Sequence, residues 1–459
     1  MDNQIIKFSQ EEWDACMKVL ESLVEDPLNN PDNDRFKNII SKISKKAKKQ
    51  LAKQKTINLD KEWINPKKID NELISSTTII TNAKNNASYF THSDDSRHII
   101  FTELKNPKRC YICHNLYNQL HFFYHKLCLE CATLNYANRS LGIELSGKTA
   151  IVTGGRIKVG FATALRLLRC NARVVVTTRF PGAAWSEFSK ESDFAVWKDR
   201  LIIYGLDLRN LKAVYDFVEF CKNQLECLDI LINNAAQTIK YPIEYYSGLI
   251  SKEVKNIEAA TIMVVANSTP IQKEANKFLP ELENFPQTKN RFGQPIDYRT
   301  KNSWNSKLGE IELEELLEVN LINQISPYLL VSELKPLMIK LPHQPKIIVN
   351  VTSSEGQFSY KNKTVFHPHT NMTKAALNML TKTSASDLAG YNIFMNSVDV
   401  GWISTGASEA RRNDQFEKLQ IPPLDPVDGA SRIMHNIVQI LNETPEFGCL
   451  YKDYQKVDW

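Results

Sequence analysis

The sequence predicts an α/β protein in which residues 146–459 form a doubly wound parallel sheet. Two observations support this prediction: short apolar runs alternate with helical patterns beyond Ser146, and a glycine-rich turn follows the first run. Each run is too short for a helix, rich in β-branched residues and apolar on both alternate faces. A parallel strand that is covered by helices on both sides has this pattern.

The expected strands occupy residues 149–153, 173–178, 200–206, 229–233, 346–352 and 391–398. Helical patterns such as VGFATALRLLR and MTKAALNMLTKTSASDLAG separate them, and Gly390 stands where the latter helix should end. Strands and helices that alternate in this way imply right-handed connections, with ligands bound at the C-terminal ends of the strands.

One connection breaks this rhythm, because residues 240–304 form an interval far longer than the roughly two to six residues that are usual. An insertion at the C-terminal edge of the sheet would cover the ligand site or make a subunit contact. A surface insertion without a role is an equally good interpretation.

The N-terminal region, residues 1–73, is expected to be helical, because apolar residues recur at three- and four-residue spacing around Trp13 and between Phe36 and Leu51. The second helix carries seven lysines between Lys37 and Lys53. They could meet nucleic acid, anionic lipid or an acidic protein partner, but a solvated face is the favoured interpretation. Residues 74–104 lack periodicity and are expected to be a linker.

Composition narrows the function classes. A net charge of +5 over 459 residues does not favour nucleic-acid binding. No apolar run is long enough to span a membrane, and the N-terminus lacks the pattern of a secretory signal, so a soluble, cytoplasmic protein is expected. Nine cysteines, an odd number, argue against a disulfide framework.

Four of the cysteines form two CxxC pairs within a compact segment, residues 105–145. The pairs are Cys110 with Cys113 and Cys128 with Cys131, and fourteen residues separate them. This spacing predicts one tetrahedral, structural zinc site with four thiolate ligands. A redox pair and buried cysteines without metal are the alternatives, and His114, His121 and His125 are spare ligand candidates.

The glycine-rich turn runs from Thr153 to Gly160 and leads into a helix. Glycine at a strand-to-helix turn lets the backbone approach a pyrophosphate, whose charge the N-terminus of the helix attracts. Five further motifs follow in order, so that six motifs in all occur in a region of about 310 residues. They are Asp207 in GLDLRN, Asn233-Asn234-Ala235-Ala236, Asn320 in EVNLIN, Ser353 in NVTSSEG with Lys374 after it, and NSVDVGWISTG with Gly401 and Thr405.

Together these motifs resemble the short-chain dehydrogenase/reductase family, which has a Rossmann-type fold. The resemblance implies that Thr153, Gly154 and Gly160 bind the cofactor, with Lys158 where the family has its middle glycine. It also implies that Asp207 meets the adenine and that Asn233, Lys374 and Thr405 contact the cofactor. Ser353 aligns with the catalytic serine, and Asn320 would support a water relay.

The cofactor that we predict is NADP(H) in preference to NAD(H). An NAD enzyme normally has Asp or Glu at the end of the second strand, and this chain has Thr178-Arg179 there. Arg179 could pair with a 2′-phosphate, and Arg156 or Lys158 could add a second positive charge. The alternative is that these are surface cations.

The catalytic tyrosine of the family, four residues before the lysine, is replaced by Thr370. An aliphatic hydroxyl is far too weak an acid to replace a phenol. The loop between Ser353 and Thr370 is longer than in the family and carries residues that could donate the proton instead. His369 and Tyr360 are the preferred candidates, followed by His367 and Glu355. The alternative for each of them is an ordinary loop residue without a catalytic role.

The function that these observations predict is an NADP(H)-dependent oxidoreductase acting on a carbonyl or alcohol of a small molecule. The alternative is an inactive dinucleotide-binding scaffold or sensor whose zinc module and N-terminal region bind a protein partner. Loss of the tyrosine favours the scaffold, whereas joint retention of Ser353, Asn320 and Lys374 favours the enzyme. A homo-oligomer is compatible with both.

Overall fold

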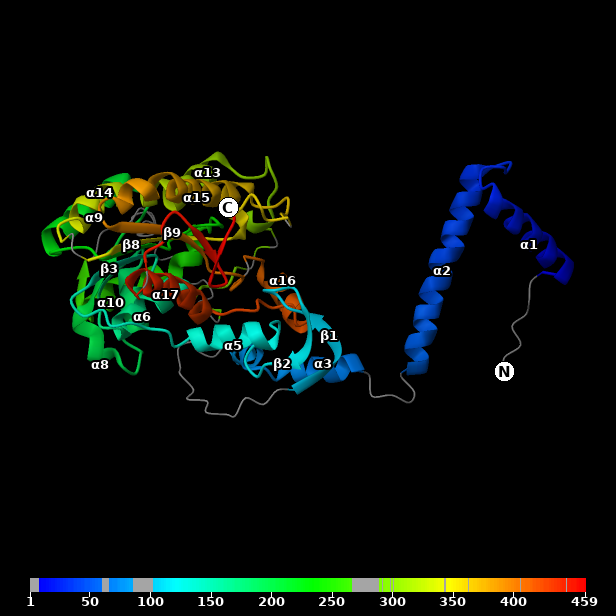
Figure 1. Ribbon diagram of the computed structural model, residues 1–459, viewed down its shortest axis with the longest axis horizontal. Helices are drawn as coiled ribbons and strands as arrows, with labels where there is room; N and C mark the ends of the chain where they lie inside the picture. Colours follow the sequence, from blue (N-terminus) through cyan, green and yellow to red (C-terminus); the bar gives the residue numbers. More distant parts are fainter. Residues whose placement is uncertain are drawn as a thin grey trace. The chain divides into compact units, whose positions relative to one another are not determined.

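The computed structural model describes residues 8–59, 66–85, 102–265 and 289–459, apart from positions 291, 298, 300, 342, 343, 362, 405 and 443. The chain divides into two compact units, Met1–Ile69 and Asp70–Trp459 (Figure 1). Among the described residues, none of the helices combines the length and the apolar character that crossing a membrane requires.

The first unit contains the helices α1 (Gln10–Glu25) and α2 (Asn33–Leu59). Helix α1 begins with a capping box, in which the Ser9 hydroxyl accepts from the Glu12 amide and the Glu12 carboxylate accepts from the Ser9 amide. No residue of α1 is buried, and Trp13 is 47% exposed. The two expected helical patterns thus correspond to real helices that have no apolar core of their own among the described residues.

The second unit is built on a nine-stranded sheet with the order β11-β10-β9-β8-β6-β3-β4-β5-β7. All neighbours are parallel except β10 and β11. This confirms the predicted doubly wound parallel sheet, in which each of the six expected strands is present. The strands are β3 (Thr149–Thr153), β4 (Arg173–Thr178), β5 (Leu201–Gly205), β6 (Ile230–Asn233), β7 (Met263–Val265), β8 (Lys346–Thr352), β9 (Ile393–Asp399), β10 (Leu450–Lys452) and β11 (Gln455–Val457).

Helices cover both faces of the sheet (Figure 1). Successive residues of β3 point to opposite sides, so that Val152 joins the core beneath α6, α7 and α17 while Ile151 joins the core beneath α9, α14 and α15. The helices of this unit after the cysteine-rich segment are α6 (Lys158–Arg169), α7 (Pro181–Phe188), α8 (Phe194–Trp197), α9 (Leu211–Gln224), α10 (Ser247–Glu258), α13 (Leu313–Asn320), α14 (Ser326–Met338), α15 (Pro368–Ala389), α16 (Glu409–Glu417) and α17 (Pro426–Asn442).

The cysteine-rich module consists of the hairpin β1 (Thr102–Arg109) and β2 (Leu116–Leu120) followed by α5 (Leu129–Asn138). The structure differs here from the expected linker at 74–104. Helices α3 (Pro66–Ser75) and α4 (Thr78–Lys84) occupy its first part, and β1 begins before residue 105. Ile79 and Ile80 are buried, and the Ile79 amide donates to the Phe123 carbonyl at 3.1 Å. Ile79 and Ile80 are too few to show a helical or strand period in the sequence, although both side chains pack into the module.

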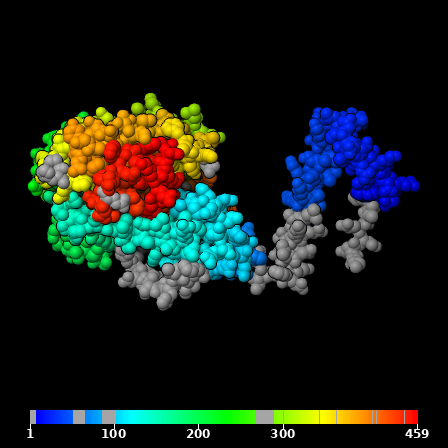
Figure 2. Space-filling model, in the orientation of Figure 1, coloured from blue at the N-terminus to red at the C-terminus, as the bar shows by residue number. Residues whose placement is uncertain are grey.

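The module is joined to the sheet domain by a buried polar network. Tyr124 donates to Asp428 at 2.5 Å, and Arg139 pairs with both Asp425 and Asp428 at 2.9 Å. These two aspartates lie at the start of α17, which also packs against α5. In Figure 2 the surface of the module, drawn in cyan, is continuous with that of the red C-terminal residues. The module and the sheet domain therefore form one packed body.

The insertion at 240–304 is in part an extension of the sheet. After a 3-10 turn (Ile243–Tyr246), helix α10 packs on α7, and strand β7 pairs with β5 and forms the edge of the sheet. Residues 266–288 lie outside the described part of the chain. Beyond them, Phe292 stacks its ring 4.9 Å from the Lys158 ammonium of the glycine-rich turn. This end of the insertion therefore lies at the expected ligand site.

Candidate active site and metal centre

The glycine-rich turn has the close backbone packing that the sequence predicted. Gly154 has a φ of +67°, and a Cβ atom at Gly160 would lie 2.4 Å from the Gly154 carbonyl oxygen and from the Asn234 amide nitrogen. No side chain fits at Gly160, and the backbone here comes within reach of a ligand at the start of α6. The cradle therefore fits a pyrophosphate.

Lys158 stands where the family has its middle glycine, and its φ is +53°. The residue thus keeps the left-handed backbone of a glycine and adds a cation at the N-terminus of α6. Its ammonium reaches Ser404 Oγ at 3.3 Å. The departure from the family pattern therefore adds a cation to the turn at a position whose backbone is left-handed.

Two guanidinium groups gather at the end of β4. Arg156 and Arg179 lie 5.7 and 5.8 Å from the centroid of the buried Phe180 ring, and Arg179 also donates to the Tyr246 hydroxyl at 3.2 Å. Burial, and then the charge of Arg179, lowers the pKa of Arg156. Like charges so placed repel each other, so the pair is suited to an anion with more than one negative charge.

Asp207 at the end of β5 is held in place by Arg209, whose guanidinium donates to it at 2.7 to 3.2 Å. Arg209 also pairs with Glu318 at 3.0 Å. Burial alone would raise the pKa of Asp207, but the hydrogen bonds and charge of Arg209 hold it below its usual value. The carboxylate is therefore ionised and fixed at the edge of the expected adenine side.

Amide side chains connect the ends of β3, β6 and β8. Asn233 donates to Asn350 at 2.8 Å, and Asn350 donates to Thr381 at 2.8 Å. The Thr153 hydroxyl accepts from the backbone amides of Asn234 and Ala235, both at 3.0 Å. These bonds fix the strand ends around the cradle. Thr405, the remaining expected cofactor residue, lies outside the described residues.

Lys374 and Thr370 share one face of α15, and both side chains are buried. The Lys374 ammonium donates to the Val351 carbonyl at 2.8 Å, two residues before Ser353. Burial lowers the pKa of Lys374 to about 8, against the opposing charges of Glu355 and Asp399. The lysine and the expected serine thus lie at the same end of the sheet.

The two substitute proton donors differ in access. The His369 Nε2 atom lies 3.3 Å from the Thr238 carbonyl oxygen, and its Nδ1 atom is buried without a hydrogen-bond partner. Burial lowers the pKa of His369, and its Nε2 atom faces the Thr238 carbonyl oxygen. Tyr360 is 38% exposed, and the Lys452 ammonium lies 5.2 Å from its ring. Lys452 also donates to Ser354 at 2.9 Å, which places Tyr360 toward the serine end of β8.

The two other loop candidates, His367 and Glu355, make different contacts. His367 stacks on Trp304 and its Nδ1 lies 2.8 Å from the Trp304 carbonyl oxygen. The Glu355 carbonyl accepts from Lys363 at 2.6 Å. His367 therefore anchors the end of the insertion.

Asn320 is the last residue of α13, and its side-chain amide donates to the Leu316 carbonyl of that helix at 2.7 Å. Asn323, which the sequence did not single out, also binds near Lys374: its side chain accepts from the Gln237 amide at 2.8 Å and donates to the Gln237 carbonyl and to Thr373, both at 3.0 Å. Residues Leu321–Ile325 form a π-helical turn, which shifts the helix phase after Asn320.

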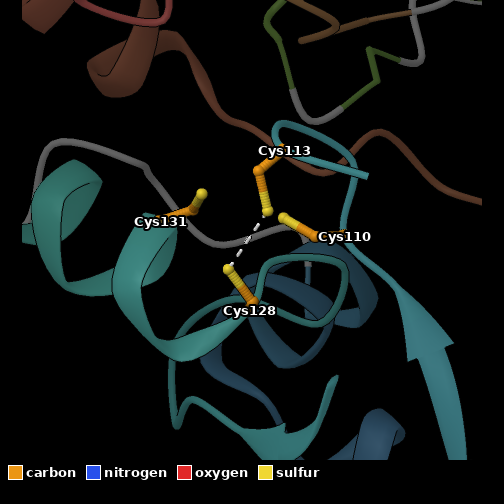
Figure 3. A group of neighbouring side chains, drawn as sticks. All are labelled: Cys110, Cys113, Cys128 and Cys131. Carbon is orange, nitrogen blue, oxygen red and sulfur yellow. Dashed lines mark hydrogen bonds between the residues drawn. The ribbon is translucent and has the colours of Figure 1, made fainter. Parts of the chain in front are cut away.

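The four cysteines converge as predicted (Figure 3). Cys110 and Cys113 lie on the knuckle between β1 and β2, while Cys128 caps α5 and Cys131 lies in its first turn. Their sulfur atoms lie within 4.8 Å of one another, and those of Cys113 and Cys128 are 3.6 Å apart. Ligands at about 2.3 Å from a tetrahedral zinc would be about 3.8 Å apart, so the cluster fits such an ion.

The spare histidines do not enter this cluster. His121 accepts from the Phe123 amide through Nδ1 at 3.0 Å, and burial lowers its pKa to about 4. Among the described residues, the group of possible metal ligands is the four cysteines alone. The donor set is therefore all sulfur, which leaves no open position for catalysis.

Sequence comparisons agree with this architecture. The family described as "short chain dehydrogenase" matches residues 148–275, and the one described as "Enoyl-(Acyl carrier protein) reductase" matches residues 299–421. The two matches together cover more than half of the chain. The protein belongs to the short-chain dehydrogenase/reductase family, a family of oxidoreductases.

The similar proteins differ in how much of the chain they cover. Uncharacterized protein R665 of Acanthamoeba polyphaga mimivirus is 33% identical over 341 residues, which are 72% of this chain and 71% of that protein. Short-chain dehydrogenase reductase 3a of Arabidopsis thaliana is 35% identical over 94 residues, 20% of this chain and 35% of that protein. The carbonyl reductase Sniffer of D. melanogaster aligns with 68% of this chain and 100% of its own, at 19% identity and a TM-score of 0.45.

Proposed function

We propose that this protein is an NADP(H)-dependent oxidoreductase that interconverts a carbonyl and an alcohol in a small-molecule substrate. The observation that carries the proposal is the pair of guanidinium groups, Arg156 and Arg179, beside the glycine-rich turn. A 2′-phosphate would relieve their mutual repulsion and accept charge-assisted hydrogen bonds from both. Lys158 would add a third cation from the turn itself.

The other cofactor contacts follow from the strand ends. Thr153, Gly154 and Gly160 would hold the pyrophosphate, and Asp207 would border the adenine. Asn233, Lys374 and Thr405 would hold the nicotinamide side. When bound, the nicotinamide would supply or accept the hydride. Ser353 would donate a hydrogen bond to the substrate oxygen, and the buried Lys374 cation would stabilise negative charge there.

Titration of both dinucleotides tests the cofactor assignment. We expect NADPH to bind more tightly than NADH. Arg179→Ala should reduce the difference between the two binding free energies by about 1 to 3 kcal/mol, which is what hydrogen bonds to a charged group contribute. Arg173→Ala is the matched control, because Arg173 is an exposed arginine at the opposite end of β4. Equal affinities for the two dinucleotides in the unchanged protein would contradict the assignment.

Lys374 provides a prediction that is independent of turnover. Its pKa of about 8 lies below the value of 10.5 that applies when the chain is unfolded, so the unfolded chain binds more protons between these values. Stability should therefore rise with pH across that window, and the cost of the buried charge is fully present below pH 8. Lys374→Met should raise the melting temperature at pH 7 and weaken dinucleotide binding.

Calorimetry and dinucleotide titration check this prediction together. Lys382→Met is the control, since Lys382 is an exposed lysine on the same helix. A lower melting temperature for Lys374→Met with no change for Lys382→Met would show that the buried ammonium stabilises the fold, contrary to expectation.

We further propose that the four-cysteine cluster binds one structural zinc ion. The alternative to the enzyme is a dinucleotide-binding scaffold without turnover. Two features favour it: Thr370 cannot act as the family's phenol, and the His369 Nε2 atom lies against the Thr238 carbonyl oxygen. In this alternative the module and the N-terminal unit would meet a protein partner. The two functions differ in turnover and share dinucleotide binding.

A further inference from the structure

The cysteine knuckle directly contacts the loop that follows β9. The Tyr111 hydroxyl, from the residue after Cys110, accepts the Trp402 backbone amide at 2.9 Å. A Cβ atom at Gly401 would lie 3.7 Å from the same hydroxyl. We call residues 400–404 the β9 loop.

A second residue of the module strengthens this contact. The Lys126 ammonium lies 4.9 Å from the Trp402 ring and donates to the Ile421 carbonyl at 2.8 Å. The Lys126 carbonyl in turn accepts from the Tyr111 amide at 2.9 Å. The module therefore contacts Trp402 at two places: the Tyr111 hydroxyl binds its backbone amide, and the Lys126 ammonium lies over its ring.

The other side of the β9 loop meets the glycine-rich turn. Ser404 accepts from the Lys158 ammonium at 3.3 Å, and Lys158 is the left-handed residue at the start of α6. The buried side chain of Ile403 and that of Val159 in α6 both cover Gly429, each within 3 Å of where a Cβ atom would stand. The loop is thus packed between the cysteine cluster and the cradle for the dinucleotide.

From this arrangement we infer that Tyr111 is a positioning residue, which couples metal binding at the four cysteines to dinucleotide binding at the glycine-rich turn. The inference rests on the proposed dinucleotide site and the proposed zinc. A metal-held knuckle keeps the Tyr111 hydroxyl on the Trp402 amide, and this bond holds the β9 loop against Lys158. Such coupling is reciprocal, so a bound dinucleotide must also retain the metal more tightly.

The first measurement needs no variant. We expect saturating NADPH to reduce the fraction of zinc that a competing colorimetric chelator removes from the full-length protein at equilibrium. An equal fraction of zinc removed with and without saturating NADPH would overturn the coupling. Failure of NADPH to bind at all would overturn the proposed function, and titration of the same sample distinguishes that result.

The second measurement removes one hydroxyl. Tyr111→Phe should keep its zinc, bind NADPH about threefold to tenfold more weakly and lose the protection of zinc by NADPH. Tyr117→Phe is the matched control, because the Tyr117 hydroxyl donates to the His125 carbonyl at 3.0 Å within the module. The control should keep both affinity and protection. NADPH affinity and zinc protection that are unchanged in Tyr111→Phe would assign the coupling to other contacts and overturn the role of Tyr111.

Discussion

Purified protein is expected to contain about one zinc per chain, and Cys131→Ser is expected to lose it. The four sulfur atoms lie within 4.8 Å of one another, and replacing one thiolate by a hydroxyl removes a soft ligand from a closed site. Metal analysis by mass spectrometry measures this directly. Structural zinc contributes on the order of 10 kcal/mol to small zinc-dependent folds, so the effect on the module should be large.

The effect of metal loss on folding should be confined to the module and the β9 loop that it contacts. The module also packs on the sheet domain through Tyr124 and Arg139, which would hold part of it in place. Hydrogen exchange should therefore rise in residues 102–138 of Cys131→Ser and remain unchanged in the central strands. Cys16→Ser is the control, since Cys16 is an exposed cysteine far along the chain from the cluster. A metal-free wild-type protein, purified without chelators, would contradict the zinc assignment.

The sequence predicted the central strands because burial on both faces leaves a continuous apolar signal. It missed β7, β10 and β11, which have three residues each and lie toward the edges of the sheet. The end of α15 shows a similar limit. Gly390 follows the helix as predicted but has a right-handed backbone, and the positive φ falls on Asn392.

The candidate site was predictable where a motif fixes its geometry. The two CxxC pairs bring four sulfur atoms together. The glycine-rich turn is recognisable because its backbone packs so closely that no side chain fits at Gly160. The contact of Asn323 with Gln237 was not predictable. It depends on the π-helical turn at Leu321–Ile325, and no periodic pattern in the sequence indicates that turn. Tyr111 occupies an unspecified position within the first CxxC pair, and only the packing of the module on the sheet domain shows that its hydroxyl contacts Trp402.

Turnover is the property that separates the enzyme from the scaffold. Reduction of a carbonyl needs a proton at the developing alkoxide, and a positioned acid typically contributes about 10²- to 10⁴-fold to the rate. Thr370 cannot supply this proton as a phenol would. Ordinary reductase substrates should then react slowly, and any activity should depend on Tyr360 or His369.

Tyr360 is better placed than His369 to donate a proton to a substrate. The Tyr360 ring lies 5.2 Å from the Lys452 ammonium, which also contacts Ser354, whereas the His369 Nε2 atom lies 3.3 Å from the Thr238 carbonyl oxygen. Tyr360→Phe should therefore lower kcat by about 10²-fold or more and leave NADPH affinity nearly unchanged. His369→Asn should have the smaller effect, and the double replacement should abolish the remaining activity.

Tyr391→Phe is the matched control for these variants. Tyr391 is also a partly exposed tyrosine with a lysine over its ring, since Lys335 lies 3.9 Å from its centroid, but it follows the C-terminal end of α15. Its replacement should leave kcat unchanged. Full activity in the double variant would exclude both residues as the donor. An absence of turnover across a broad panel of carbonyls and alcohols, with NADPH binding intact, would instead support the scaffold, because the dinucleotide cradle is independent of the missing phenol.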